Sequence, residues 1–325
     1  MTLPRRRFLT VATSALALPA LISRGRAENY PSRPIRLLVG FPPGGAADII
    51  ARLTGQMLSE RLGQPFVVEN RGSAGQQIAA EAVVNAPPDG YTLLLLANPN
   101  VINGMLNPTL NLSFTRDLVP IGGVDLNPLI LEVHPSLPVK SVPDLIAYAK
   151  AHPGEINMAS GGVGSTPHLA GELFKMLTGI TMLHVPYRGD APAVTDLLAG
   201  QDQVMFDLIV LSLNHIRGGV LRGLAVTSAT RLPSLPDLPP VADFVPGYEA
   251  VAWQGLAAPK DTPGEIITRL NTELNSALAD ARIKTRIADL GGVPMPMSPA
   301  DFAKLITSET EKWGKVIKFA GIKAE

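Results

Sequence analysis

The sequence predicts an α/β protein made of two doubly wound domains joined by a hinge. Short runs of aliphatic and β-branched residues alternate with stretches of helical periodicity, which is the pattern of βαβ units. The apolar runs are nearly continuous, as expected for parallel strands with helices on both faces. The pattern occurs twice along the chain, and irregular segments separate the repeats. A single large doubly wound sheet is the alternative interpretation.

The first unit alternates three strands with two helices. Its strands are predicted at 35–39, 66–69 and 91–96, where the sequence reads IRLLV, FVVE and YTLLLL. A Gly-rich turn leads from the first strand into a helix that runs through Leu62 and stops at Gly63. The second strand leads into a helix that ends at about Asn85. We therefore expect a βαβαβ unit.

The second unit repeats this order from residue 143 onward. Helices are predicted at 143–152, 167–178, 190–199 and near 213–218, and strands at 156–159, 182–185, 203–206 and 221–227. A further strand at 251–258 precedes a helix with Ile266, Leu270 and Leu274 on one apolar face. A last helix is predicted at 299–319, and we expect it to pack back on the first domain.

Two segments have the composition of crossovers between the domains. Residues 122–138 read GGVDLNPLILEVHPSLP, and five prolines crowd the extended segment 229–246. These crossings assign 28–125 and 231–325 to domain one and 126–230 to domain two. Two crossings form a hinge pair, which is the arrangement needed for closure around a ligand.

The first 27 residues have the composition of an export signal. Arginines at 5–7 precede an apolar stretch from Phe8 to Ile22, which is too short to anchor the chain in a bilayer, and small residues follow. We expect cleavage after about Ala27. The arginines also fit a twin-arginine address, while the alternative is the ordinary positive region of a signal for unfolded chains.

The mature sequence is mildly acidic. Five of the 28 basic residues and none of the 28 acidic ones lie in the leader, which leaves a net charge of about −5. No basic tract or aromatic-plus-basic patch follows, which argues against a nucleic acid or an anionic membrane as the partner. No later segment free of charged residues reaches the length of a transmembrane helix. The absence of cysteine excludes thiol catalysis and cysteine-ligated metals.

No cofactor is expected, and catalysis is the weaker alternative to ligand binding. The five histidines show no metal-ligand spacing, and no G-x-G-x-x-G follows a strand. Ser165, His184 and Asp207 supply the residue types of a hydrolase triad, but no G-x-S-x-G elbow surrounds a serine. His168 is expected to pack or hydrogen-bond within the first turn of its helix.

The most informative loop is GGVGSTPH, residues 161–168, because it leaves a strand and enters a helix. Thr166 is expected to be the N-cap and Pro167 the first helical residue, so free backbone N–H groups meet the positive end of the helix dipole. Since the loop lacks the lysine of a P-loop, a small carboxylate suits it at least as well as a phosphate. An ordinary capped βα turn is the alternative.

A second loop, FPPGGAAD at 41–48, also lies at a strand end, where ligands of open α/β sheets bind. Its glycines free N–H groups at the start of a helix. Asp48 lies in the first turn, where it either caps N–H groups or orients a donor of the ligand. The loop is therefore a candidate to face GGVGSTPH across a cleft.

A third loop, HVPYRGDAP at 184–192, places Tyr187 and Arg188 before a turn at Gly189. The arginine either forms a bidentate bridge to a carboxylate or an ordinary ion pair. Asp207 ends another strand and is expected to face the same cleft or to cap the following turn.

Seven motifs resemble those of one family. They read FPPGGAADIIAR, ENRGSAGQQIAAEAV, PPDGYTLLL, GVGSTPHLAGELF, HVPYRGDAPAVTDLLAG, LPDLPPVAD and WQGLAAPKDTP. In this order they are similar to the substrate-binding receptors of tripartite tricarboxylate transporters, the TctC or Bug family. The resemblance implies a periplasmic, non-catalytic, monomeric Venus-flytrap protein. Such a receptor captures a small mono- or dicarboxylate and delivers it to membrane transporter subunits or, in the runner-up interpretation, to a sensor kinase.

The resemblance also implies which residues contact the ligand. One loop per domain holds the carboxylate through backbone N–H groups and ordered waters. The expected contacts are Phe41, Pro42, Gly45, Ala46 and Asp48 in the first loop, Gly162, Gly164, Ser165 and Thr166 in the second, and Tyr187, Arg188, Gly189 and Asp207 for selectivity. Arg188 replaces the usual lysine of the family, which keeps the charge but gains a planar fork.

Overall fold

The computed structural model describes residues 30–72, 77–106 and 112–323, so the predicted leader and its cleavage site lie outside the described residues. The first unit has the predicted order. β1 (Ile35–Val39) pairs in parallel with β2 (Phe66–Asn70) and β3 (Thr92–Ala97), and α1 (Ala46–Leu62) and α2 (Gln77–Val84) connect them. A helix that the sequence did not predict, α3 (Asn98–Leu106), follows β3 directly.

The second unit also confirms the predicted alternation. Its elements are α4 (Val142–Ala151), β5 (Asn157–Ser160), α5 (Thr166–Thr178), β6 (Leu183–Pro186), α6 (Asp190–Leu198), β7 (Val204–Leu208), α7 (Ile209–Arg217), β8 (Arg222–Val226) and a short 3₁₀ helix (Val241–Asp243). β5 pairs in parallel with β6 and β7. α7 begins earlier than predicted, directly at the end of β7.

Segment 122–138 does join the two units, but as a strand and not as the predicted irregular segment, because most of it belongs to a long strand, β4 (Leu118–Val133). β4 runs antiparallel to β9 (Val251–Pro259), β7 and β8. Its glycines and prolines indicated a loop, but register shifts beside Gly122 and Gly123 accommodate them as bulges. In the described chain, the strands form one mixed ten-stranded sheet in the order β2-β1-β3-β9-β4-β7-β5-β6, with β8 and β10 (Val293–Pro294) paired to β4.

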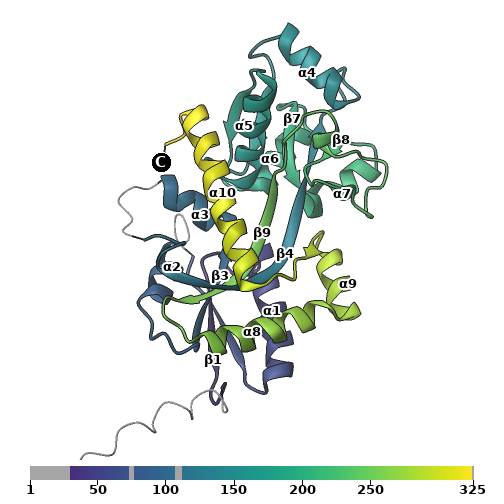
Figure 1. Cartoon of the computed structure of the whole chain (residues 1–325). Coiled ribbons are helices and arrows are strands. Elements are labelled where there is room, and N and C mark those ends of the chain that lie inside the picture. The colour runs from purple at the N-terminus through teal and green to yellow at the C-terminus, as the bar shows by residue number, and fades with distance from the viewer. Residues whose placement is uncertain (1–29, 73–76, 107–111, 324–325) are drawn as a thin grey trace, which may run out of the picture.

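The proline-rich segment 229–246 does not cross between the units, contrary to the prediction. The N–H of Val226 donates to the carbonyl of Pro239 at 2.9 Å, which holds the segment beside β8. Val245 and Tyr248 then pack into the apolar core of the second unit. The chain returns to the first unit along β9, so the two parallel units are linked through the paired strands β4 and β9 rather than through loops (Figure 1).

The last helix, α10 (Pro299–Ala320), packs on both units. The sequence had predicted packing on the first unit alone. It lies beside α3, α5 and β4 (Figure 1). Phe302 and Ile306 enter a core of the first unit, whereas Trp313 and Val316 enter the core of the second. α8 (Gly264–Leu278) and α9 (Ala281–Asp289) cover the first unit. Among the described helices, none combines the length and apolarity needed to cross a membrane.

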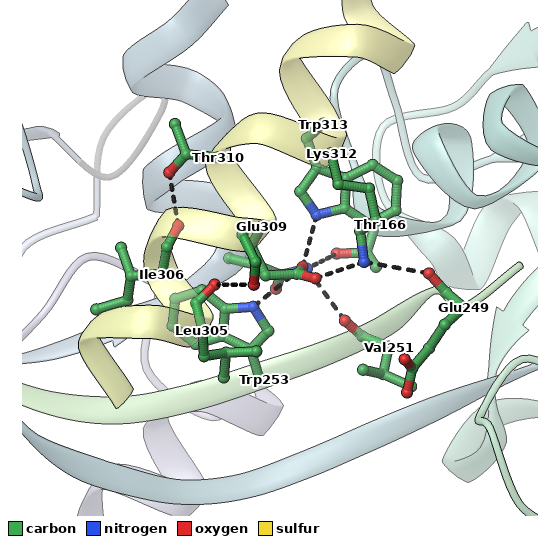
Figure 2. A network of polar contacts seen from close by, with 12 residues as sticks. Thr166, Glu249, Val251, Trp253, Leu305, Ile306, Glu309, Thr310, Lys312 and Trp313 are labelled. Atoms are coloured by element: carbon green, nitrogen blue, oxygen red, sulfur yellow. Dashed lines mark hydrogen bonds and ion pairs between the residues drawn. The ribbon is translucent and has the colours of Figure 1, made fainter. Parts of the chain in front are cut away.

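A buried carboxylate in the middle of α10 ties this helix to β9, as Figure 2 shows. Glu309 Oε2 accepts hydrogen bonds from Trp313 Nε1 at 2.7 Å and from Trp253 Nε1 at 3.3 Å. The other carboxylate oxygen pairs with Lys312 Nζ, which also donates to the carbonyl of Glu249 at 3.1 Å. Because Trp253 belongs to β9, the network fixes α10 against a strand that links the two units.

Candidate functional site

A cavity of about 800 Å³ lies where helices of both units begin. Within the described residues, the first turns of five helices line it: α1, α3, α5, α6 and α7. The N-terminal end of a helix carries partial positive charge and unpaired N–H groups, so such a cavity suits an anion. The strands β4 and β9 add Asn127, Trp253 and Gln254 to the lining.

The first predicted loop forms one wall of this cavity. Phe41, Pro42 and Gly45 line it. Gly45 is the N-cap of α1 in an extended conformation, and no side chain caps this helix. The N–H groups of Ala47 and Asp48 therefore have no acceptor among the described residues. This wall presents unpaired donors at the positive end of a helix.

Asp48 braces the first loop from behind and is not part of the lining. Its carboxylate accepts from the N–H of Gly44 at 2.9 Å, from Arg52 Nε at 3.0 Å and from Asn70 Nδ2 at 2.9 Å. Burial favours a higher pKa, but these three hydrogen bonds outweigh burial and hold the pKa of Asp48 below its usual value. Ala46 is the first residue of α1, and its side chain lies outside the described residues.

The second predicted loop forms another wall through Gly164, Ser165 and Thr166. Ser165 is the N-cap and not Thr166 as predicted, because Ser165 Oγ accepts from the N–H of His168 at 3.3 Å. Thr166 is instead the first helical residue. Its N–H has no acceptor among the described residues, and its Oγ1 accepts from Asn98 Nδ2 at 3.2 Å. The helix and its unpaired N–H thus begin one residue earlier than the cap pattern indicated.

Two stacked histidines brace this second loop. His168 Nδ1 accepts from the N–H of Gly164 at 3.0 Å, which confirms the expectation of a hydrogen bond within the first turn. The ring stacks on His184 with centroids 3.7 Å apart, and His184 Nε2 lies 2.6 Å from Ser160 Oγ. Burial lowers the pKa of His168 to about 3 and that of His184 to about 4, so both rings are neutral at neutral pH. Gly162 donates its N–H to Ser160 Oγ and lies outside the lining.

Tyr187, Arg188 and Gly189 of the third predicted loop lie outside the lining, whereas Asp190 and Ala191 of the same loop belong to it. The hydroxyl of Tyr187 contacts the carboxylates of Asp196 and Asp202 at 2.8 and 2.7 Å. Arg188 is exposed and forms no ion pair with any described residue. Gly189 is the N-cap of α6. These three residues, which were expected to govern selectivity, therefore lie away from the cavity lining. Their contact with the ligand stays a prediction.

Asp207 is buried behind the cavity and not in its lining. Its Oδ2 lies 2.6 Å from Ser212 Oγ, and Glu132 Oε1 lies 2.7 Å from the same hydroxyl. A hydroxyl has one proton to donate, so one of the two carboxyls must be protonated to complete both hydrogen bonds. Burial raises the pKa of Asp207 to about 7 and that of Glu132 well above its usual value. Ser165, His184 and Asp207 thus have separate partners.

The expected contacts did not include Asn98, Asp190, Gln254 or the first turn of α7, which all belong to the lining. Asn98 directly follows β3, so the rule that ligands bind at strand ends could have found it. α7 gave no signal because Leu208 precedes it in the N-cap position, without a side-chain cap. Gln254 lies inside β9, and nothing in the local sequence marks it.

The charge of the lining is unusual for an anion site. Among its described residues it contains no lysine or arginine, and Asp190 is the single ionisable side chain. The described part of the chain also lacks any group of three side chains that could hold a metal ion. An anion in this cavity would thus be held by backbone N–H groups and helix dipoles.

A family model described as "Tripartite tricarboxylate transporter family receptor" matches residues 50–322. The chain belongs to this family. Its members are periplasmic solute-binding proteins. Protein BugT of Bordetella pertussis is similar to this receptor, with 38% identity over 316 residues that cover 96% of this chain and 95% of BugT.

Two solved structures extend the comparison. Rpa4515 of R. palustris with adipate has a TM-score of 0.77 and 39% sequence identity, and the match covers 90% of this receptor and 99% of that chain. MatC (Rpa3494) from Rhodopseudomonas palustris with bound malate has a TM-score of 0.73 and 31% identity, and the match covers 89% and 100% of the two chains. These matches confirm the predicted α/β fold of the periplasmic binding protein type.

Proposed function

We propose that this receptor captures a small mono- or dicarboxylate in the cavity and delivers it to the membrane subunits of a tripartite tricarboxylate-type transporter. The observation that carries the proposal is the convergence of helix N-termini from both units on one cavity. Backbone N–H groups supply the positive pole there, since no described lysine or arginine does.

The unpaired N–H groups of Ala47 and Thr166, which both line the cavity, are the proposed carboxylate donors. A hydrogen bond to a charged group contributes about 1.5–3 kcal/mol. A few such bonds, reduced by the cost of association, correspond to dissociation constants of about micromolar size. The cavity is larger than a small acid, so ordered waters complete the remaining contacts.

The ligands of the relatives support this class of ligand. One related structure contains adipate and another contains malate. In this chain, Ile50, Ile209 and Leu290 line part of the cavity, and their apolar side chains suit the carbon chain of an organic acid. The proposed receptor therefore combines generic carboxylate binding with an apolar wall.

Residues 1–27 are proposed to direct export through the twin-arginine route, with cleavage after about Ala27. The test is the location of the protein in a strain that lacks twin-arginine translocation. We expect the precursor to stay in the cytoplasm of that strain. Normal appearance in the periplasm would show that the leader is an ordinary signal for unfolded chains.

Calorimetry of the mature protein with a panel of mono- and dicarboxylates tests carboxylate capture. Ser165→Pro should abolish binding, because the N–H that Ser165 donates to the Gly162 carbonyl is lost together with the cap. The φ of Ser165 in the wild type is −67°, which fits proline, so the variant should fold.

Ser298 is a matched control, since it caps α10 with a φ of −68° and the same side-chain hydrogen bond three residues on. Because Ser298 is not part of the cavity lining, Ser298→Pro should keep the wild-type affinity for the ligand. If no carboxylate in the panel binds the wild type, the proposed function is wrong. If Ser165→Pro binds normally, the backbone cradle is wrong while carboxylate capture stands.

Delivery to a transporter is tested by co-purification of the tagged receptor with membrane proteins. We expect transporter subunits in the presence of the ligand. Recovery of a sensor kinase in their place would support the sensing alternative.

A further inference from the structure

Asp190 differs from every other described residue of the cavity lining because it alone is ionisable. It is the first residue of α6, whose N-cap residue provides no side-chain hydrogen bond. No described lysine, arginine or histidine forms an ion pair with Asp190, and no described side chain hydrogen-bonds to it. A carboxylate inside a site built for carboxylates requires a physical explanation.

The surrounding backbone is shaped to hold this carboxylate in place. Asp190 Oδ1 is buried without a hydrogen-bond partner and lies against Gly161. A side chain at position 161 would collide with this oxygen. The N–H of Gly189 donates to the Gly161 carbonyl at 3.1 Å, which joins the start of α6 to the α5 loop. Burial raises the pKa of Asp190, and the backbone N–H of Gly161 beside the carboxylate acts in the opposite direction. Asp190 is therefore fixed at the cavity with no cationic side chain paired to it among the described residues.

The cavity consequently has two kinds of recognition groups. The first turns of α1 and α5 offer N–H donors, while Asp190 on α6 offers an acceptor. A ligand with only carboxylate groups places a second negative charge in the lining that already holds Asp190. A ligand that also carries a donor satisfies both kinds of group and removes the cost of an unpaired buried carboxylate.

We propose that Asp190 selects, among the carboxylates that the receptor captures, those that also carry a hydroxyl or ammonium donor. This selection rests on the proposed function, because it presupposes that a carboxylate occupies the cavity. It identifies the ligand as a hydroxy acid or an amino acid and distinguishes it from a plain mono- or dicarboxylate.

The test is calorimetry with two matched series of acids. The first is succinate, malate and aspartate, which share a four-carbon diacid and differ in one substituent, and the second is adipate and 2-aminoadipate. For the wild type, the acids that carry a donor should bind about tenfold tighter than the plain diacid, or more. A plain diacid that binds as tightly as its hydroxy and amino derivatives in both series would overturn the proposal.

Asp190→Asn separates the two donor classes. The variant keeps an acceptor oxygen but loses the charge, so an ammonium preference should fall by about tenfold while a hydroxyl preference persists. Whichever donor class the wild type prefers, succinate and adipate should bind Asp190→Asn more tightly than they bind the wild type, because a like charge has been removed. Weaker binding of the plain diacids to Asp190→Asn would mean that Asp190 donates a proton to a second carboxylate, and the proposal would be wrong.

Asp144→Asn is the control, since Asp144 is an acid in the first turn of α4 and not part of the lining. It makes the same change in charge and should leave every affinity unchanged. Asp190→Ser serves as a second variant if Asp190→Asn has a lowered midpoint of thermal unfolding, and it should lose the same preference for donors. Absence of binding by all acids to the wild type would contradict the proposed function itself, whereas equal binding would contradict only the role of Asp190.

Discussion

The two glycine loops that line the cavity enter their helices in a similar way but are stabilised by opposite means. The loop before α1 has no side-chain cap and is held by Asp48, whose lowered pKa keeps it charged. The loop before α5 is capped by Ser165 and held by the neutral ring of His168. The same Gly-rich signal thus yields one wall that depends on charge and one that depends on a buried neutral acceptor.

This difference also divides the donors between the walls. In the α5 loop, the N–H groups of Gly162, Gly164 and Ser165 are already paired within the protein. In the α1 wall, Ala47 and Asp48 keep unpaired N–H groups. We therefore expect the α5 loop to be the more rigid wall and the α1 loop to gain more from the ligand.

The largest effect is expected from Gly164→Val in the rigid wall. Gly164 has a φ of +75°, and a Cβ there would lie 2.8 Å from Leu106 Cδ1. The positive φ alone costs a valine about 1–2 kcal/mol, and displacement of the loop should weaken ligand binding by roughly a hundredfold. The measurements are urea unfolding and calorimetry.

Gly179→Val is the control for this strain, since Gly179 has a φ of +68° at the other end of α5 with nothing near its Cβ position. It should lose similar stability and keep full affinity. Equal loss of affinity in both variants would mean that strain anywhere in α5, and not the loop geometry, weakens binding.

His168→Leu should give the next largest effect. It leaves the buried N–H of Gly164 without an acceptor, which costs about 1–3 kcal/mol in the free energy of unfolding. His152→Leu is the comparison, because His152 stacks on Tyr148 in a partly buried position and braces no loop of the cavity. If both variants unfold at the same urea concentration, His168 is not the support of the rigid wall.

Asp48→Asn should have a smaller effect on the other wall. The amide still accepts from Gly44, but the ion pair with the half-exposed Arg52 is lost, so we expect a loss of about 0.5–1 kcal/mol at pH 7. Because the pKa of Asp48 is lowered by folding, this stability is present above the usual pKa of an aspartate and disappears as the pH falls through the folded value. Urea unfolding at pH 7 and pH 3 measures the difference, which should be smaller at the lower pH.

The smallest effect concerns the protonation of the rigid wall at ordinary pH. The pKa values of about 3 and about 4 for His168 and His184 lie below the unfolded value, so their contribution to stability is full above about pH 6.5 and is lost as the pH falls towards 3. We expect no change in the imidazole proton NMR signals of either residue between pH 8 and pH 5.5. Titration of either signal within that range would show that the stacked pair is accessible to protons.

The sequence predicted the walls of the site better than it predicted their selectivity. Glycines between an apolar strand and a helix are sufficient to indicate both loops, because only such a turn brings N–H groups to a strand end. The alternation of a strand does not by itself tell which face a terminal side chain occupies. Asp207 was therefore placed in the cleft, whereas it points to Ser212 and Glu132 behind it.

The misplaced elements have equally physical causes. The run DLIVLSL at 207–213 reads as apolar and uncapped, so the start of α7 and its contribution to the cavity gave no local signal. The glycines and prolines of β4 resemble a loop unless its pairing with β9 is known, and that pairing joins residues far apart in the sequence. Tertiary pairing, and not local propensity, decides both cases.

The shared acceptor in α10 gives this receptor an internal optical reporter. The chain contains two tryptophans, Trp253 in the cavity lining and Trp313 in the core of the second unit, and both indoles donate to the same oxygen of Glu309. Indole emission responds to the distance and charge of such an acceptor. A shift of β9 against α10 changes the distance between Trp253 and Glu309 and with it the fluorescence of Trp253, so unlabelled protein can report its own conformational changes.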